Sequence, residues 1–586
     1  MDSLARGLLL VGLASAGTYD NSTQPGNSTQ PSSGNCNTAD NRACWQDGFN
    51  ITTDYESSTP SGGLKHYDWE VTEVENWVGP DGVVKGYVQL VNGQYPGPTL
   101  FADWGDTISV TVTNSLPFNG TSFHWHGIRQ FHSNIHDGAN GVTECPLAPG
   151  SSKTYTFKAE QYGTSWYHSH TSAQYGNGVW GPIQIGGPAS ANYDVDLGVF
   201  PINDYYYKSA DELVIETSVG GPPPSDNILL NGTNINPLDP SQGEYAVVTL
   251  TPEKRHRLRV FNPSVENHYQ ISLVGHNFTV IATDLVPVVN TSVNNVFVAI
   301  GQRYDIIIDA DQGVDNYWFN VTQFDSSACG TSKNLRPAAV FRYDGAGDGL
   351  PTDLGERPDD AHCQDDTSSF VPVVSRTADE TTLLVDAGNP EHQLNVNVTF
   401  GTSATQPTLW MVNDSAINVN WDKPVLQYVL EGNTSYPRTE NLIFNDDRHD
   451  GWTYWVIQNL KGIPHPMHLH GHDFLILGSA ATTTFTPSLS SSLNFANPTR
   501  RDVSMLPGNG YLVIAFRADN PGNWLFHCHI AWHVSGGLAA DFMERRGEQV
   551  ALISDDDLAA FNQTCAEWNT FSKTAPPKID SGLRRL

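Results

Sequence analysis

Histidines arranged in pairs are the residues of this chain best suited to chemistry. Four short segments contain ten of its 20 His residues: His124-Trp125-His126, His168-Ser169-His170, His465-Pro466-Met467-His468-Leu469-His470, and His527-Cys528-His529 followed by His533. In a strand, residues i and i+2 share a face, so each His-x-His pair directs two imidazoles toward one point. A single pair would be typical of hydrogen-bonded core histidines. Burying all four segments without a ligand would leave many imidazole nitrogens needing other partners, so together they predict metal sites.

The types of donor atom indicate which metal binds. Cys528 with two His offers the thiolate and two imidazoles of a blue-copper electron-transfer site, although zinc accepts the same ligands. A weak axial Met is expected a few residues after the last His, but the residue five positions after His533 is Leu538, which cannot coordinate. A missing axial donor favours Cu(I) and raises the reduction potential. The other eight His come with no sulfur donor, which fits a cluster of several coppers held by neutral imidazoles.

Strand alternation links the two kinds of site. His527 and His529 face one way and Cys528 faces the other, so one short peptide can contact both the thiolate copper and the cluster. Strand rise and side-chain reach predict a separation on the order of 10 to 15 Å between them. A simple copper store has no need for such coupling.

Composition excludes several classes of function. The 586 residues include 63 Asp plus Glu against 31 Lys plus Arg, and the net charge of −32 would repel nucleic-acid phosphates and anionic membrane surfaces. We therefore expect no nucleic-acid partner and no membrane partner. Gly (52) and Pro (36) are plentiful and aromatic residues reach 10%, a mixture that favours many short strands and turns. Short alternating apolar runs such as Thr107 to Thr113 predict an all-β sandwich fold, and the clearest helix is expected over Ser554 to Trp568.

The N-terminal region and the cysteines indicate export. Arg6 precedes a short apolar stretch followed by small residues, which predicts a signal peptide over 1–20, followed by a disordered lead-in or propeptide over 21–35. The chain holds twelve Asn-x-Ser/Thr sequons and seven Cys. Cys528 belongs to the metal motif, so six Cys remain for three disulfides. We expect a secreted, glycosylated protein.

Composition shifts near Gly186-Gly187-Pro188 and over Gly345 to Thr367 predict domain boundaries. The expected domains are 36–188, 189–371 and 372–583, with 584–586 a possible removed C-terminal propeptide. The His pairs occur only in the first and last thirds of the chain, so we expect the middle domain to carry no copper.

The sequence resembles the multicopper oxidases, specifically secreted laccases of the ascomycete type, from about Cys36 onward. Besides the copper motifs, the resemblance rests on Asn41-Arg42-Ala43-Cys44-Trp45, the segment Asp137 to Pro146, and the segment His527 to Leu538. It implies three cupredoxin-like Greek-key β-sandwich domains with few short helices. The middle domain would form one wall of the substrate pocket, and the copper cluster would lie between the first and third domains.

The resemblance also implies particular roles for the site residues. Four copper ions would be bound: type 1 by His465, Cys528 and His533, with Leu538 at the empty axial position; type 2 by His124 and His468; and the type 3 pair by His126, His168, His170, His470, His527 and His529. Disulfides would join Cys36 to Cys44, Cys145 to Cys565 and Cys329 to Cys363.

Two acids are candidate catalytic residues beside Cys528. Glu266 matches the acid that contacts phenolic substrates near the type 1 site in similar enzymes, where a base would accept the proton that a phenol loses with its electron. The alternative is a solvated loop acid. Asp137 matches an acid that assists proton delivery to the cluster, and otherwise is a turn residue before Gly138. Asp580-Ser581-Gly582-Leu583 looks like the C-terminal plug of ascomycete laccases, with processing after Leu583.

The expected reaction is the one-electron oxidation of phenols or aromatic amines at a shallow type 1 pocket, coupled to the four-electron reduction of O2 to water. The enzyme is expected to be a monomer, with roles such as lignin turnover. A ferroxidase, or an oxidase of ascorbate or bilirubin, is the enzymatic alternative, but a ferroxidase would need a carboxylate cluster close to His465 or His533, and the flanking sequences contain none. A non-catalytic copper carrier is the third alternative, and the low Met content (5) argues against it.

Overall fold

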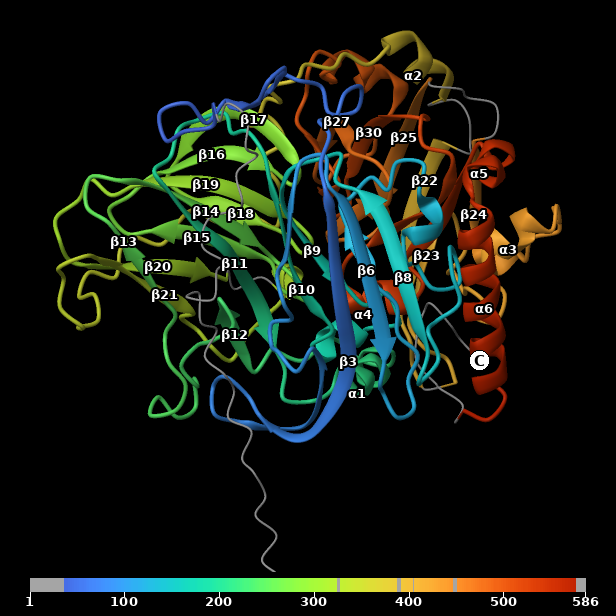
Figure 1. Ribbon diagram of the computed structural model, residues 1–586, viewed down its shortest axis with the longest axis horizontal. Coiled ribbons are helices and arrows are strands. Elements are labelled where there is room, and N and C mark those ends of the chain that lie inside the picture. The colour runs from blue at the N-terminus through green and yellow to red at the C-terminus, as the bar shows by residue number, and fades with distance from the viewer. Residues whose placement is uncertain (1–35, 324–326, 387–391, 404, 446–450, 576–586) are drawn as a thin grey trace, which may run out of the picture.

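A computed structural model describes residues 36–323, 327–386, 392–403, 405–445 and 451–575. These residues form three pairs of β-sheets lying side by side, which are blue to cyan, green, and orange to red in Figure 1. The expected all-β class is confirmed. The expected signal peptide, the lead-in over 21–35 and the C-terminal segment containing Asp580 and Leu583 lie outside the described residues. No helix among the described ranges has the length and apolar character needed to span a membrane.

The first pair of sheets follows from alternating apolar residues. The pair combines a sheet of order β4-β3-β6-β8 with a sheet of order β5-β10-β9-β7. Its strands are β3 (Leu64–Val78), β4 (Val84–Val91), β5 (Leu100–Asp103), β6 (Thr107–Asn114), β7 (His124–His126), β8 (Ser152–Lys158), β9 (Gly163–His168) and β10 (Trp180–Gly186). In β6, the predicted strand, Ile108, Val110 and Val112 are buried in one core cluster. Two further short strands, β1 (Cys44–Gln46) and β2 (Phe49–Asn50), pair at the N-terminal side.

The middle pair of sheets has a six-stranded order β12-β11-β14-β19-β16-β17 and a five-stranded order β13-β21-β20-β15-β18. Its strands are β11 (Val195–Tyr205), β12 (Asn227–Leu230), β13 (Val247–Leu250), β14 (Arg255–Phe261), β15 (Tyr269–Leu273), β16 (Phe278–Thr283), β17 (Val286–Val293), β18 (Val296–Val298), β19 (Arg303–Asp309), β20 (Asn316–Thr322) and β21 (Ala338–Tyr343).

The last pair of sheets repeats this arrangement, with orders β23-β22-β25-β30-β27-β28 and β24-β32-β31-β26-β29. Its strands are β22 (Gln393–Thr399), β23 (Leu409–Val412), β24 (Leu442–Asn445), β25 (Trp452–Asn459), β26 (His465–Leu469), β27 (Phe474–Ala480), β28 (Arg500–Arg501), β29 (Val503–Leu506), β30 (Tyr511–Arg517), β31 (Gly522–Cys528) and β32 (Ala539–Glu544). Parallel and antiparallel pairings also agree position by position: β11 with β14 and β22 with β25 are parallel, as are β13 with β21 and β24 with β32. The middle and last sheet pairs are therefore structural repeats of each other, although no exact internal repeat is visible in the sequence.

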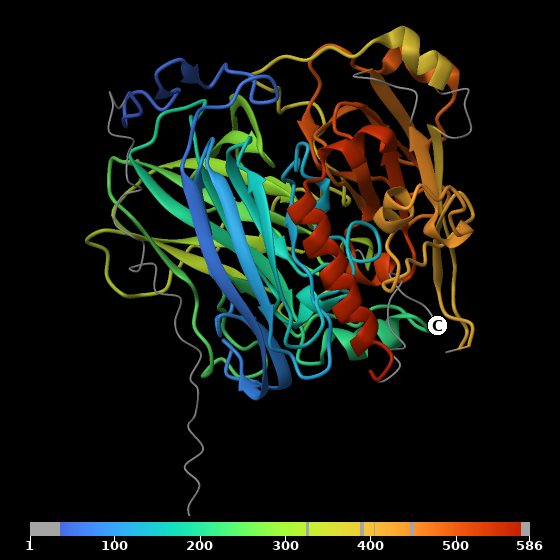
Figure 2. The same ribbon diagram turned by 45° about the vertical axis from the view of Figure 1, so that its right-hand side comes forward.

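Short helices fill the ends and seams between the sheets. They are α1 (Ala210–Thr217), α2 (Glu380–Asp386), α3 (Val425–Leu430), α4 (Ala531–Ser535), α5 (Arg546–Leu552) and α6 (Asp555–Phe571). The predicted C-terminal helix is α6, and the side chain of Ser554, the residue before it, accepts a hydrogen bond from the Asp557 N–H. Phe561, Cys565 and Trp568 recur at helical spacing and are buried in a cluster with residues of the first and last thirds. Figure 2 shows α6 lying across the seam between the blue-cyan and orange-red sheets.

Three disulfides are present among the described residues. Their sequence separations differ widely: 8 residues for Cys36–Cys44, 34 for Cys329–Cys363 and 420 for Cys145–Cys565. The last joins the segment after Asp137 to helix α6, and Cys528 is the free and buried cysteine.

We predict that the disulfides contribute unequally to stability. Replacing both Cys145 and Cys565 with Ala should cost about 3 kcal/mol more than replacing Cys36 and Cys44, because closing the longer loop removes more chain entropy from the unfolded state. Thermal unfolding of the two double variants, compared with the parent protein, measures the difference. Equal losses in the two variants would contradict this account.

Candidate metal centre

The His pairs lie on equivalent strands of the first and last sheet pairs. β7 and β9 are neighbours in the first pair, as β26 and β31 are in the last. Register places His124 opposite His168 and His468 opposite His527. The corresponding strands of the middle pair, β15 and β20, contain no His or Cys. This arrangement brings eight His side chains from the two outer sheet pairs into one buried group.

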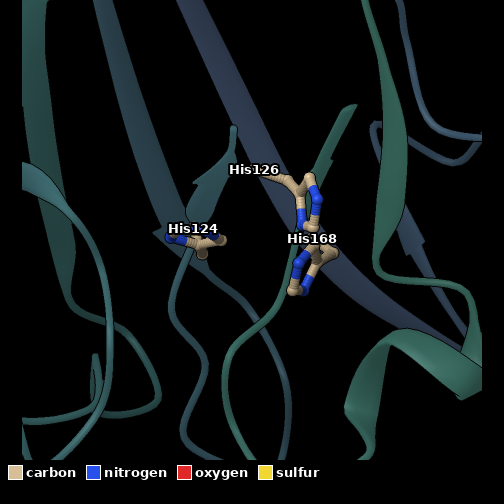
Figure 3. A group of neighbouring side chains, drawn as sticks. All are labelled: His124, His126 and His168. Carbon is tan, nitrogen blue, oxygen red and sulfur yellow. The ribbon is translucent and has the colours of Figure 1, made fainter. Parts of the chain in front are cut away.

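Ring nitrogens in this group approach one another at metal-site spacing. His470 Nε2 lies 3.2 Å from His527 Nε2, and His529 Nε2 lies 3.2 Å from His126 Nδ1. Ligands about 2 Å from one ion lie at such separations from each other. Figure 3 shows His124, His126 and His168 gathered at the ends of β7 and β9. Triads able to hold an ion among the described residues are His124–His126–His168, His124–His468–His470, His170–His470–His527 and His126–His468–Asp502.

Hydrogen bonds to the backbone orient several of these rings. The Nδ1 atoms of His124, His168 and His468 contact the carbonyl oxygens of Asp137, Ser169 and Asp502 at 2.9, 3.0 and 2.9 Å, respectively. An Nδ1–H donor leaves the lone pair on Nε2. These three Nε2 atoms are buried and have no hydrogen-bond partner among the described residues. Buried, unpaired lone pairs fit a set of metal ligands, so the residues present match the expected copper cluster.

Burial also keeps these rings in the form that binds metal. Desolvation, with repulsion from neighbouring imidazoles, holds the pKa values of His126, His468 and His470 well below the ordinary value. For His527, burial lowers the pKa to about 4. The rings are therefore neutral near pH 7, and a neutral imidazole is the copper ligand.

A second group lies on the other face of β31. His465 Nδ1 lies 3.1 Å from His533 Nδ1, and Cys528 Sγ lies 3.5 and 3.6 Å from these two atoms. All three side chains are buried, and together they can hold one ion. The Cys528 N–H donates to the carbonyl of Leu538, a fully buried apolar residue. Trp410, which sequence reasoning missed, packs on His533 with ring centroids 3.8 Å apart.

Two acids contact the His cluster. Asp137 Oδ2 lies 2.8 Å from His470 Nδ1, and its Oδ1 lies 3.2 Å from His124 Nδ1. The structure thus places Asp137 against two of the predicted ligands. Asp502, which sequence reasoning missed, lies 3.3 Å from His126 Nε2 and is itself held by two 2.6 Å bonds from Arg303. Asp502 ends the charged run Arg500-Arg501-Asp502, and no metal-binding motif in the sequence includes it.

Glu266 lies in a cavity of about 950 Å³ beside the second group. Among the described residues that line this cavity, Glu266 is the only acid, and Trp410, Trp532 and His533 lie on its wall. A volume of this size holds a drug-sized molecule. Burial, then the charge of Asp204, raises the pKa of Glu266 well above its usual value. The solvated-acid alternative therefore does not fit, because Glu266 is only 6% exposed.

His472 and the flanking aromatic residues have other contacts. His472 Nε2 lies 3.0 Å from Glu544 Oε2, and none of the possible metal groups in the described ranges includes His472. Trp166 packs on His168 with ring centroids 4.3 Å apart. The aromatic residues that flank the His motifs, among them Phe123, Trp125, Trp166, Trp180 and Trp532, are buried in the apolar cores.

Comparison with known proteins agrees with this geometry. Family models described as "Multicopper oxidase" match residues 72–190, 196–346 and 401–548. Laccase-1 of Melanocarpus albomyces is 54% identical over 96% of this chain and 91% of its own length, and the laccase of Neurospora crassa is 53% identical over 94% and 89%. The crystal structure of the laccase from Botrytis aclada has a TM-score of 0.85, with 38% identity over 93% of this chain and 99% of that chain.

The chain belongs to the multicopper oxidase family. Its three sheet pairs are cupredoxin-like domains, and it binds four copper ions: one of type 1, one of type 2 and a type 3 pair. It is an oxidoreductase of the laccase type, which oxidises phenols and reduces O2.

We predict that two neighbouring histidines respond differently to substitution. His470→Gln should reduce the copper content of the purified protein, because His470 belongs to two of the possible metal groups. His472→Gln is the matched control and should retain four coppers. Elemental analysis of both variants measures the difference. Equal copper contents in the two variants would contradict the placement of these rings.

Proposed function

We propose that the individual ligands are distributed as the family pattern suggests. His465, Cys528 and His533 bind type 1 copper, and their short mutual contacts support this set. His124 and His468 bind type 2 copper. The type 3 pair is bound by His126, His168, His170, His470, His527 and His529, supported by the two 3.2 Å contacts between Nε2 and ring nitrogens of this set.

The cavity beside His533 binds the reducing substrate, a phenol or aromatic amine. Apart from Glu266, its wall consists of apolar and neutral polar residues, so it suits a flat aromatic ring. Trp410 and Trp532 offer ring surfaces for stacking. A ferroxidase would need several carboxylates here, and the described lining has one.

Glu266 accepts the phenolic proton. Its Oε2 atom has no hydrogen-bond partner among the described residues, although the side chain is buried and lines the cavity. The raised pKa makes its carboxylate a stronger base once ionised. When copper is bound, it supplies the one-electron oxidation and the reduction of O2 to water.

Asp137 and the Cys528 peptide serve the other half of the reaction. The carboxylate of Asp137 is a proton acceptor next to His470 and His124, where protons are consumed in forming water. His527 and His529 flank Cys528, so this peptide is the covalent connection between the two copper-binding groups.

The remaining features describe a secreted enzyme. We propose removal of residues 1–20, glycosylation at some of the sequons, processing after Leu583 and a monomeric state. The three disulfide pairs suit an oxidising, extracellular location. We also propose domain boundaries at 36–188, 189–371 and 372–583.

The observation that carries this function is the pairing of one thiolate site with one buried His cluster on opposite faces of β31. The copper content, the visible spectrum and oxygen uptake test it together. We expect four coppers per chain, an intense thiolate-to-copper band, and one O2 consumed for every four phenols oxidised. Formation of H2O2 in place of water, or one copper per chain, would overturn the proposed coupling.

We predict that Glu266→Gln lowers kcat/KM for a methoxyphenol about 100-fold, because general-base assistance is lost. Activity on phenols should fall as the pH drops through the pKa of Glu266, and the variant should lose this dependence. Hexacyanoferrate(II) gives up an electron without a proton, so its oxidation should change little. Similar losses for both donors would contradict the role of Glu266 as a base.

A further inference from the structure

The segment 263–267, which carries Glu266, is fixed by a second buried carboxylate. Asp204, near the end of β11, accepts three successive backbone N–H bonds: Val265 N to Oδ1 at 2.9 Å, Glu266 N to Oδ2 at 2.8 Å and Asn267 N to Oδ2 at 3.0 Å. Asp204 is 6% exposed. The three N–H groups belong to Glu266 and to the residue on each side of it. Because all three donate to one carboxylate, they fix the backbone position of Glu266.

Two further bonds attach the same segment to its surroundings. The Asp204 N–H donates to Ser264 Oγ at 3.0 Å, so Asp204 holds the segment through its backbone as well as its side chain. On the opposite side, the Ala531 N–H of α4 donates to the Val265 carbonyl at 2.9 Å. Helix α4 also carries His533. The segment thus connects Asp204 of the middle sheets to the helix of a type 1 ligand.

Asp204 does not line the cavity and therefore acts on the substrate only through Glu266. The cavity wall includes Glu266 but not Asp204, so a bound phenol would touch only the first of these acids. The titratable groups that interact with Glu266 are Asp204, Tyr175, Tyr206 and Cys528. No basic side chain offsets the raised pKa of Glu266.

We propose that Asp204 is the positioning residue for proton transfer from the phenol, because it places the Glu266 carboxylate beside the cavity that His533 also lines. The inference rests on the proposed role of Glu266. In the assisted step the phenolic O–H bond breaks, its proton goes to the Glu266 carboxylate, and one electron leaves toward the copper site, with O2 as the final oxidant.

The charge of Asp204 gives the proposal a specific pH signature. After burial, this charge is the second cause that raises the pKa of Glu266. Neutralising Asp204 should therefore lower the pKa of Glu266, and the acidic limb of the pH profile for phenols should move to lower pH. A variant with merely reduced stability would not show this shift.

The test compares Asp204→Asn with the parent enzyme on two donors. The amide of Asn can accept through only one atom, so at least one backbone N–H loses its partner and the segment shifts. We expect kcat/KM for a methoxyphenol to fall about 10- to 100-fold, since misplacement by about 1 Å has costs of this size. Oxidation of hexacyanoferrate(II) should stay within about twofold, and the visible copper band reports that the variant is folded.

Asp226→Asn is the matched control. Asp226 is a comparably buried acid of the middle domain that accepts the Tyr207 N–H at 2.7 Å and pairs with Lys333, and no hydrogen bond joins its side chain to the described segment 263–267. This variant should keep the phenol-to-hexacyanoferrate ratio of the parent enzyme. If Asp204→Asn is not secreted in folded form, Ser264→Ala removes the backbone bond from Asp204 and should give a smaller loss confined to phenols.

A double variant separates this inference from the proposed function. If Asp204 acts through Glu266, Asp204→Asn combined with Glu266→Gln should behave as Glu266→Gln alone. Additive losses, or equal losses on both donors in Asp204→Asn, would overturn the positioning role. An unchanged phenol rate in Glu266→Gln would instead overturn the proposed base, whatever Asp204→Asn does.

Discussion

The ion pair between Arg303 and Asp502 is the interaction on which the copper-binding core depends. Arg303 belongs to β19 of the middle sheets, and both of its Nη atoms bond Asp502 at 2.6 Å. Its Nε donates to the carbonyl of Thr164 in the first pair of sheets at 3.2 Å. One guanidinium therefore joins all three sheet pairs at a fully buried point. Removing Arg303 would leave the buried carboxylate of Asp502 without this cation, which costs about 3–5 kcal/mol in proteins.

This junction explains why a middle domain without metal ligands is needed for the metal centre. Asp502 contacts His126 from the first sheet pair and, through its backbone carbonyl, His468 from the last. The cluster forms only if the two outer sheet pairs keep their relative position to within a fraction of an ångström. Arg303 of the middle sheets supplies the charge that fixes this relative position. They also supply β11 and the segment 263–267, so the same domain positions the wall of the substrate cavity.

The fold separates two environments that a single site could not provide. The His cluster is buried: burial lowers the pKa of rings such as His468, and the Nε2 atoms of His124, His168 and His468 have no hydrogen-bond partner among the described residues. The thiolate group on the opposite face of β31 borders a large cavity. An aromatic radical formed in that cavity can leave without reaching the cluster where O2 is reduced. Strand alternation places His527 and His529 on one face and Cys528 on the other. These three residues therefore keep the two groups apart and also connect them covalently.

The sequence by itself determined the metal chemistry and the fold class. His-x-His spacing has meaning only on extended strands, so the motifs predicted both the ligands and the β structure that carries them. Local alternation likewise predicted β6, and helical periodicity predicted α6. Cys528 could be set aside from the disulfides because its two neighbours are His. These signals are local in the chain, and each residue type has few alternative uses in that pattern.

Only the tertiary structure decided which distant residues complete the sites. Asp502, Arg303, Trp410 and Asp204 carry no spacing signal, because each acts through a contact made hundreds of residues away or through the backbone. The equivalence of the middle and last sheet pairs was hidden for a similar reason: strand order depends on long-range pairing, which many sequences satisfy. The size of the substrate cavity also depends on how α1, the segment after β22 and α4 meet. Composition and periodicity do not predict this arrangement, since it is set by the packing of whole domains.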